Sequence, residues 1–395
     1  MKKRLLLIAD ADTIWTMKML RYQILPHGYE VVLFPIWGNK GKYADFYRES
    51  GVTVYQDRHT LPVISKIPRV RMWARIALNA RDLIKMGPFD VVHNCYLSQR
   101  DLALGQRIVN RFKSHWICSF WGSDLMRASA LALRRMKPYM DQCDVISVHN
   151  EKNVDMILSA YGEAAAKKTH LIYFGQTGYA DIADMLKIRT RSQCREMFGI
   201  APDRFVVSVG YSASPAQQQL EVIEAMAKMP KERLERITLV LQQTYGATDP
   251  EYIRKTRELA AQMPCQTVAL TDFMGPEESA MLRLSTDVFV HSIKTDAFSA
   301  SLQEYLYAGA CVLKGAWLSY PQLKEMNITL SEFAQFDEVP ALIEKAMDHE
   351  IHGLTEEERE LFPKLYSWDA VRESWLKMFP QQKSPGLDRR DKERV

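Results

Sequence analysis

The feature that most constrains the fold is a regular alternation of short apolar runs with segments of helical periodicity. Each run is bounded by turn-forming residues, as in 90-DVVHNCY-96, and an amphipathic stretch such as 97-LSQRDLALGQRIVNRFK-113 follows it. Strands that are apolar along their whole length and alternate with helices form parallel sheets covered on both faces. We therefore expect an α/β protein. The other expected strands lie at 4–10, 30–36, 116–121, 144–149, 205–211, 237–243, 267–271, 287–292 and 310–313.

The alternation comes as two series, separated by a break near residues 172–190. A chain of 395 residues is long for a single domain and fits two domains of roughly 150–200 residues. Because 47% of its residues are hydrophobic and 25% are charged, it has ample material for two cores. We expect two doubly wound, Rossmann-like domains, over residues 1–175 and 190–365.

Composition also bears on the compartment of the protein. Its six cysteines are scattered without a Cys-x-x-Cys pair, so we expect reduced core thiols of a cytosolic protein. The start, MKKRLLLIADADTIW, has an apolar run of only about five residues, too short for an export signal. No stretch reaches the ~18 apolar residues of a membrane span. We expect a soluble, cytoplasmic protein, and the net charge of +4 gives no indication of nucleic-acid binding.

The charge is unevenly distributed along the chain. Residues 66–85 carry six basic side chains against one acid, Asp82, interleaved with apolar residues such as Met72 and Trp73. A basic amphipathic helix of this kind can lie on an anionic membrane surface. The alternative is a surface helix whose apolar stripe packs on its own sheet.

Ligands of open parallel sheets bind beyond the carboxyl ends of the strands, so we expect site residues in the loops that follow the strands. The first, 10-DADT-13, could hold a divalent metal through its two aspartates. Asp12 or Thr13 could instead cap the next helix, and we favour capping or a substrate contact. In the second, 119-SFWGSDLMR-127, Gly122 permits a tight turn, and a helix cap is again the alternative. Its site candidates are Asp124 and Arg127.

Two loops of the second series have the pattern of anion sites. In 210-GYSASPAQQQLEVIEA-225, a glycine ends a strand and Pro215 opens a helix, whose free amides and dipole favour an anion. In 295-TDAFSASLQEYLYAGACVL-313, a helix is expected to begin near Ser299 and to end at a Gly309 cap. Core packing explains most of this segment, but it does not explain the acid at Glu304.

The order of these motifs resembles that of the two-domain GT-B glycosyltransferases. The similarity is greatest to family 4 and to the group that transfers the 4-acetamido-4,6-dideoxygalactose unit of enterobacterial common antigen. In 296-DAFSASLQEYLYAGACVL-313, Asp296 stands in place of the first Glu of the family 4 donor motif, while Phe298, Glu304 and Gly309 match. Further similar segments are 119-SFWGSD-124, 191-RSQCREMFGIAPDRFVVSVGY-211, 272-DFMGPEESAMLRLSTDVFVHS-292 and 366-YSWDAVRESWLKMF-379.

This sequence also departs from the family 4 pattern. The Arg and Lys that neutralise the donor pyrophosphate in that family are missing from 210-GYSASPAQQQ-219, and Trp121 replaces the His of the His-Gly-Ser-Asp turn. Similar replacements are associated with the common-antigen group. Family 4 enzymes retain the anomeric configuration, whereas the other group is thought to invert it, so the stereochemical outcome stays open.

The resemblance implies a GT-B fold, with two Rossmann-like domains that face across a cleft. The first would bind the acceptor and the second the nucleotide sugar, and a helix over 366–380 would cross back to the first. The implied activity is metal-independent transfer, without a cofactor, from a nucleotide-diphosphate sugar to a saccharide or lipid-linked saccharide in cell-surface glycan synthesis. The oligomeric state is left open, and residues 381–395 are expected to be disordered.

Specific residues follow from these motifs and the resemblance. Amides of the two anion loops would hold the diphosphate, and a cation would supply the missing positive charge. Glu304 would bind the ribose, and Asp296 would bind a hydroxyl of the donor sugar. Replacing Glu304 by Ala should then impair donor use with little change in melting temperature. His149 and His291 are expected to be core histidines. The amide candidates are Gly210, Ser212, Ser214, Ser299, Ala300 and Ser301, the cations Lys294 and Arg127, and the acceptor bases Asp124, Asp12 and His93.

Two other functions remain open at this point. A nucleotide-sugar epimerase of the same fold would share the donor acid but would have no acceptor. A non-catalytic GT-B-like partner subunit would account for the missing Arg and Lys.

Overall fold

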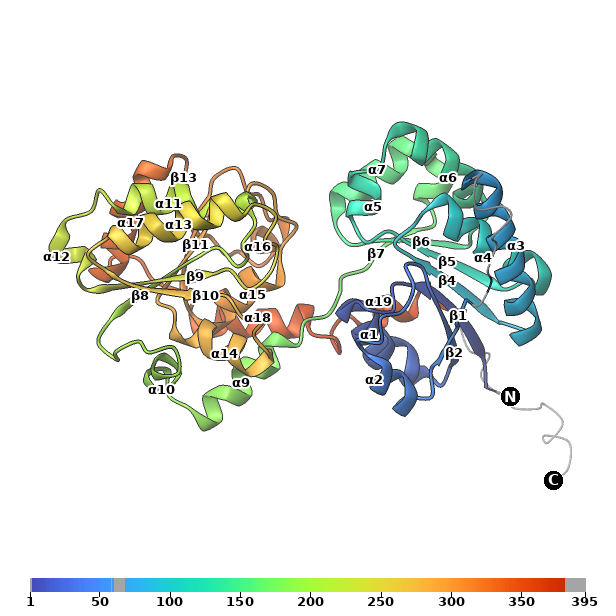
Figure 1. The fold of residues 1–395 in the computed structure, drawn as a ribbon, viewed down its shortest axis with the longest axis horizontal. Coiled ribbons are helices and arrows are strands. Elements are labelled where there is room, and N and C mark those ends of the chain that lie inside the picture. Colours follow the sequence, from blue (N-terminus) through green and yellow to red (C-terminus); the bar gives the residue numbers. More distant parts are fainter. Residues whose placement is uncertain (1, 58, 60–67, 381–395) are drawn as a thin grey trace, which may run out of the picture. The chain divides into compact units, whose positions relative to one another are not determined.

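In the computed structural model, which describes residues 2–57, 59 and 68–380, the chain forms two compact units (Figure 1). Unit 1 contains the chain up to Gly175 and again from Trp368, and unit 2 contains Gln176–Ser367. Each unit is a parallel sheet with helices between successive strands. The predicted α/β class with two doubly wound sheets is therefore confirmed.

The sheet of unit 1 has seven parallel strands in the order β3-β2-β1-β4-β5-β6-β7. The order reverses between β1 and β4, which lie side by side with Leu5 opposite Val91. The loops after these two strands therefore flank the switch point of the sheet, where ligands of such folds bind. The strands are β1 (Arg4–Ala9), β2 (Glu30–Pro35), β3 (Thr53–Val54), β4 (Val91–Cys95), β5 (His115–Ser119), β6 (Val145–Val148) and β7 (Thr169–Leu171).

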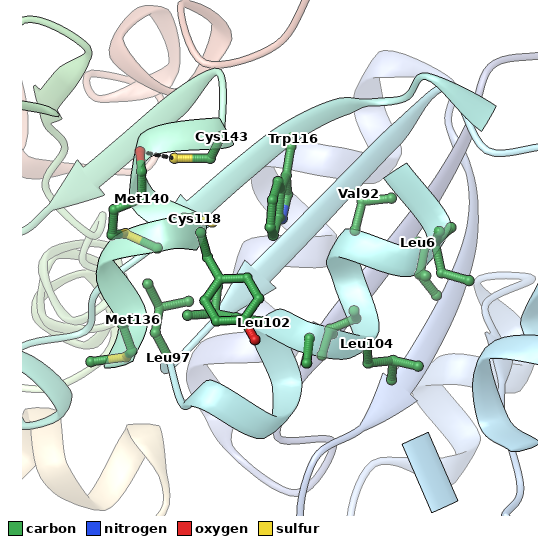
Figure 2. Close-up of a cluster of buried hydrophobic side chains, with 14 of the residues drawn as sticks. Leu6, Val92, Leu97, Leu102, Leu104, Trp116, Cys118, Met136, Met140 and Cys143 are labelled. Carbon is green, nitrogen blue, oxygen red and sulfur yellow. Dashed lines mark hydrogen bonds between the residues drawn. The ribbon is translucent and has the colours of Figure 1, made fainter. Parts of the chain in front are cut away.

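Alternating strand residues bury both faces of this sheet. Leu6 and Ile8 of β1 join one hydrophobic cluster, and Leu5 and Leu7 join the other. In Figure 2, leucines of α4 and methionines of α6 surround Trp116 and Cys118 of β5 in the first cluster. The helices of unit 1 are α1 (Ile14–Met19), α2 (Ala44–Glu49), α3 (Pro68–Met86), α4 (Gln99–Phe112), α5 (Ser123–Met126), α6 (Ala130–Gln142), α7 (Glu151–Tyr161), α8 (Glu163–Ala166) and α19 (Arg372–Leu376), with a π-helical turn at Leu20–Ile24 and a 3-10 turn at Leu25–His27.

The sheet of unit 2 has six parallel strands in the order β10-β9-β8-β11-β12-β13, which reverses between β8 and β11. Helices α11, α13 and α17 pack on one of its faces. Its strands are β8 (Phe205–Val209), β9 (Ile237–Gln242), β10 (Gln266–Leu270), β11 (Val288–His291), β12 (Cys311–Gly315) and β13 (Ser331–Phe333). Its helices are α9 (Gly178–Ile188), α10 (Arg191–Glu196), α11 (Gln219–Met226), α12 (Lys231–Leu234), α13 (Pro250–Gln262), α14 (Pro276–Ser285), α15 (Ala300–Ala308), α16 (Pro321–Glu325), α17 (Val339–Met347) and α18 (Glu356–Tyr366), with 3-10 turns at Pro215–Gln217 and Phe336–Glu338.

All six cysteines are free, and five of them are buried. Cys118 and Cys143, for example, lie in the hydrophobic cluster of Figure 2. They pack as small apolar residues, as their apolar sequence context predicts.

The structure corrects three predictions of secondary structure. Strands β3, β7 and β13 were not expected, because these short edge strands lack an apolar run. The helix predicted over 366–380 is shorter in the structure: α18 ends at Tyr366, and α19 begins only at Arg372. The interruption has a physical cause, since the backbone at Ser367 is extended and pairs with Gln176 in a parallel bridge.

The third correction concerns the helix expected after Pro215. A 3-10 turn over Pro215–Gln217 comes first, and α11 starts only at Gln219, because Gln218 adopts a left-handed conformation with φ of 54°. The tail at 381–395 and the first residues of the basic segment, 66–67, lie outside the described residues.

Candidate functional site

Four loops meet at the switch point of unit 2, at the carboxyl ends of β8, β9, β11 and β12. The Ser292 hydroxyl donates to the Gln217 carbonyl at 2.7 Å, and the Lys294 amide donates to the Ala216 carbonyl at 2.9 Å. The Ala213 amide donates to Tyr245 at 2.7 Å, and the Trp317 indole donates to Ile293 at 2.8 Å. These bonds fix the four loops to one another, so the predicted donor residues of unit 2 lie on one connected surface.

The loop after β8 is shaped by Gly210, whose φ of +63° favours glycine. Here the chain turns against Gln217, which is buried and accepts from the Tyr211 amide at 3.2 Å. Ser212 is buried, whereas Ser214 uses its hydroxyl to accept from the Ala216 amide at 3.3 Å. These hydrogen bonds fix the conformation of the loop.

The segment that leads into α15 is held by an aspartate and a strained aromatic residue. The Asp296 carboxylate accepts from the Ser299 amide at 3.0 Å. Phe298 is buried and has φ of +67°, an unusual conformation for a bulky residue. Its ring packs against Tyr320, Phe362 and Tyr366, and these contacts stabilise the conformation. The helix then begins at Ala300 and ends at Gly309, whose φ of 85° confirms the predicted C-cap.

Asp296 also belongs to a buried polar triad. Its Oδ2 lies 3.3 Å from Nε2 of His291 and accepts from the Tyr320 hydroxyl at 2.9 Å, and Tyr320 lies 2.7 Å from the same His291 nitrogen. Burial would raise the pKa of Asp296, but the hydrogen bonds from His291, the Ser299 amide and Tyr320 hold that pKa below its ordinary value. The carboxylate therefore stays ionised at neutral pH, just before the N-terminus of α15.

Glu304 is paired with Arg283, a residue that sequence reasoning missed. The guanidinium of Arg283 is only 3% exposed and donates to Glu304 at 3.3 Å, to Gln242 at 3.0 Å, to the Tyr305 hydroxyl at 3.1 Å and to Ser301 at 3.2 Å. It also lies over the Tyr305 ring, 4.3 Å from the centroid. Arg283 thus joins β9, α14 and α15 beneath the predicted donor loop. The available signal was a charge within the otherwise uncharged run 279-SAMLRLS-285.

The carboxylate of Glu304 remains partly accessible, with 18% of its side chain exposed. Gly178 of α9 lies against it, and a Cβ at that position would be 2.4 Å from Oε1. The earlier expectation for Glu304→Ala needs correction here. Because this change would leave the buried Arg283 without its anion, it should lower the melting temperature as well as affect any ligand.

The predicted diphosphate cradle is only partly open. Among the predicted amides, that of Gly210 already donates to the Val290 carbonyl at 3.2 Å, and that of Ser299 donates to Asp296. The amides of Ala300 and Ser301, in the first turn of α15, have no acceptor among the described residues. Lys294 is exposed in the loop between β11 and α15 and can supply positive charge. The donor-site assignment of these residues stays a prediction.

In unit 1, Asp12 does not cap the following helix. Its carboxylate accepts from the amides of Lys40 at 2.6 Å and Lys42 at 3.1 Å, in the loop after β2. Thr13 occupies the N-cap position of α1 without a side-chain hydrogen bond. The capping interpretation is therefore wrong, and Asp12 instead connects the loops after β1 and β2.

Asp124 organises the loops after β4 and β5. Its carboxylate accepts from the amides of Leu97 at 2.7 Å, Trp121 at 2.9 Å and Gly122 at 2.9 Å. The residue is 8% exposed, and burial raises its pKa to about 6 although these amides favour the ionised form. Asp12 and Asp124 serve different loops, while Arg127 is exposed just after α5.

His93 lies within β4, and His149 directly follows β6 and is half-buried. His93 is fully buried with Nε2 2.7 Å from the Ser119 hydroxyl, and burial lowers its pKa to about 3. His149 bonds to the Ile172 carbonyl, and burial lowers its pKa to about 4. Both are neutral at pH 7, and the complete burial of His93 argues against contact with an acceptor. Among the described residues, no cluster of three or more His, Cys, Asp or Glu side chains could hold a metal ion.

The Arg283 network predicts a large effect on stability. Arg283→Met should lower the free energy of unfolding by about 3–5 kcal/mol, because Glu304 and its polar neighbours lose a buried cation. Arg254→Met is the matched control, since that arginine pairs with Glu251 and Glu258 on an exposed helix surface and its loss should have little effect on the free energy of unfolding. Urea unfolding measures both, and equal effects would contradict the assigned role.

Asp124 predicts a specific pH dependence. Because its folded pKa of about 6 lies above the ordinary 3.8, the folded protein binds this proton more tightly than the unfolded chain does. Its contribution to the free energy of unfolding is therefore full below about pH 4, falls as the pH rises to about 6, and is constant above. At ~1.4 kcal/mol per pKa unit, the fall is up to about 3 kcal/mol. Urea unfolding measures the free energy of unfolding of the wild type and of Asp124→Asn across this pH range. The additional fall should appear in the wild type alone, and parallel curves would contradict the raised pKa.

The sequence matches no protein-family model, and no match to a curated protein is significant. The fold nevertheless matches solved structures over 95% of the chain. A glycosyltransferase from Rickettsia africae has a TM-score of 0.68 and 12% identity over 97% of its own chain. HepE of Anabaena, solved with UDP-glucose, has a TM-score of 0.66 and 14% identity over 98% of its chain.

Sucrose-phosphate synthase from Thermosynechococcus elongatus has a TM-score of 0.62 and 13% identity over 98% of its chain. At these identities the likeness shows the fold. The chain is similar throughout to glycosyltransferase structures, which confirms the predicted GT-B fold class.

Proposed function

We propose that this protein is a glycosyltransferase that moves a sugar from a nucleotide-diphosphate sugar to a saccharide or lipid-linked saccharide. The observation that carries the proposal is the connected loop surface of unit 2, where Asp296 and Glu304 flank the first turn of α15 at a strand-order switch point. The fold likeness supports it, since HepE of Anabaena was solved with UDP-glucose. The finer resemblance to family 4 and the common-antigen group belongs to the same proposal.

In this proposal, residues of unit 2 bind the donor. Glu304, held by Arg283, accepts hydrogen bonds from the ribose diol. The free amides of Ala300 and Ser301 and the charge of Lys294 stabilise the leaving diphosphate without a metal or a cofactor. Asp296, ionised within its triad, accepts from a hydroxyl of the donor sugar.

The acceptor base is assigned to unit 1. Asp124 is the first candidate, because its raised pKa suits proton uptake near neutral pH. Asp12 is the second candidate for the acceptor base. Arg127 is a second candidate for the cation that binds the diphosphate of the donor. Whether transfer retains or inverts the anomeric configuration is decided by NMR of the product.

The acceptor is proposed to be near a membrane, in line with cytoplasmic glycan synthesis. Ile76 and Leu83 of α3 are buried against the sheet cluster, but Val70, Trp73 and Arg81 are exposed. The helix therefore packs on its own sheet and still presents an apolar and basic outer face. Such a face suits an anionic bilayer surface. None of the helices in the described part of the chain has the length and apolar character needed to cross a bilayer.

Donor binding is tested with Glu304→Gln, which keeps an oxygen to accept from Arg283 but loses the charge. We expect its dissociation constant for the preferred nucleotide sugar to rise at least ~10-fold, about 1.4 kcal/mol. Glu325→Gln, at an exposed glutamate of α16, should bind as the wild type does. Calorimetry against a panel of nucleotide sugars measures the affinities, and circular dichroism checks that the variants are folded.

The same panel separates the rival functions. Failure of the wild type to bind any nucleotide sugar would favour a non-catalytic partner subunit. Conversion of a nucleotide sugar to its isomer, without acceptor and without release of nucleotide, would favour an epimerase. Unchanged binding by Glu304→Gln would refute the donor site as assigned.

The membrane proposal predicts sedimentation with vesicles that contain anionic lipid and none with neutral vesicles. The double variant Trp73→Ala with Arg81→Ala should bind several-fold less, since a basic residue near the surface contributes about 1 kcal/mol. Arg135→Ala, an exposed arginine of α6, is the control. Equal sedimentation of the double variant and the wild type would exclude this face.

A further inference from the structure

Unit 1 contains a cavity of about 830 Å³ beyond the carboxyl ends of β2 and β3. A second cavity of about 330 Å³ shares four lining residues with it, Ile36, Trp37, Arg100 and Asp101. The two therefore form one groove, with Trp37 and Arg100 at the junction. None of the residues proposed above to bind the donor or to act as the acceptor base lines it. A cavity of this size is within the range of small-molecule sites.

One wall of the groove is an ordered polar network. The Tyr55 hydroxyl donates to Asn79 at 3.0 Å, and the Asn79 amide donates to Asp57 at 3.3 Å. Arg75 donates to the same carboxylate at 3.1 Å. Burial would raise the pKa of Asp57, but bonds from Arg75, the His59 amide and Asn79 hold it below its ordinary value. This wall therefore presents fixed donors and acceptors.

A second polar network lines the groove from the start of α4. Asp101 is buried and accepts from Arg100 at 2.8 Å and from the Ser98 hydroxyl at 2.6 Å. Arg100 also donates to the Ile36 carbonyl at 2.6 Å, which anchors its guanidinium at the junction of the two cavities. Paired carboxylate and guanidinium groups in both networks suit a ligand with many hydroxyl groups.

The groove has an excess of positive charge. Three arginines line it, Arg71, Arg75 and Arg100, against two acids, Asp57 and Asp101, which leaves one net positive charge. Arg75 and Arg100 are paired with those acids. Arg71 is exposed and has no carboxylate partner among the described residues. It is therefore the cation free to bind an anionic group of a ligand.

Trp37 provides an aromatic surface at the junction. It is 59% exposed, and its ring meets Tyr96 in a T-shaped contact at 4.9 Å. A large indole left open to solvent beside a polar cavity can cover the apolar face of a sugar ring while its surroundings bind the hydroxyls.

We propose that this groove binds a saccharide of at least two units that carries a carboxylate or phosphate group. Trp37 stacks on a sugar ring where the cavities join, the two polar networks hold hydroxyls, and Arg71 binds the anionic group. Under the proposed function this saccharide is the acceptor, and the acceptor role is the one part of the inference that rests on the proposed glycosyl transfer.

The test is direct binding to the full chain, without nucleotide sugar, measured by saturation-transfer NMR and calorimetry. The probes are disaccharides of gluco, galacto and manno configuration, each in a uronic-acid form, a 1-phosphate form and a neutral form. We expect at least one anionic form to bind at least tenfold more tightly than its neutral counterpart. The uronic-acid and phosphate arms distinguish the two sources of charge.

Arg71→Ala should remove the preference for the anionic form and leave neutral binding within about twofold. Trp37→Ala should weaken both forms. Arg134→Ala and Phe273→Ala, an exposed arginine of α6 and an exposed aromatic residue of unit 2, are the matched controls. If no anionic disaccharide binds more tightly than its neutral counterpart, or if Arg71→Ala keeps the preference, the proposal is overturned. Because no donor is present, this result does not depend on the donor site.

Discussion

The structure depends on the requirement that a parallel sheet be buried on both faces. Leu5 and Leu7 pack in one core and Leu6 and Ile8 in the other, so no face of β1 remains for a ligand. Polar chemistry is therefore confined to the ends of the strands. In both units the loops at the carboxyl ends are bonded to one another, through Asp12 and Asp124 in unit 1 and through Ser292 and Lys294 in unit 2.

In both units, buried or half-buried charged side chains fix the loops that a ligand would contact. Arg283 ties Glu304 to β9 and α14, and the half-buried Asp57 and the buried Asp101 line the groove in unit 1 with fixed carboxylates. Each buried charge has a partner of opposite sign or several hydrogen bonds, as the cost of desolvation requires. Because their partners hold these side chains in place, a ligand that contacts them would lose less conformational entropy on binding.

The sequence predicted the long apolar strands well because their pattern is local. It also placed the start of α15 and the Gly309 cap, where single residues determine the backbone. The predicted helix boundaries were wrong where the conformation is not set by the local hydrophobic pattern. The pairing of Ser367 with Gln176 separates α18 from α19, and the left-handed Gln218 places the start of α11 at Gln219. The partners of Asp12 lie about 30 residues away in the chain, so no local pattern could distinguish a loop contact from a helix cap.

By itself, the sequence determined the α/β class, the two series of strands and the position of acids at strand ends, because hydrophobic periodicity and turn residues act over short distances. Only the tertiary structure decided which of those acids are paired. It brought Arg283 under Glu304 from 21 positions away and placed Trp37, Asp57, Arg71 and Asp101 around one groove. Such juxtapositions depend on the strand order and on the packing of helices over it, which a single sequence does not display.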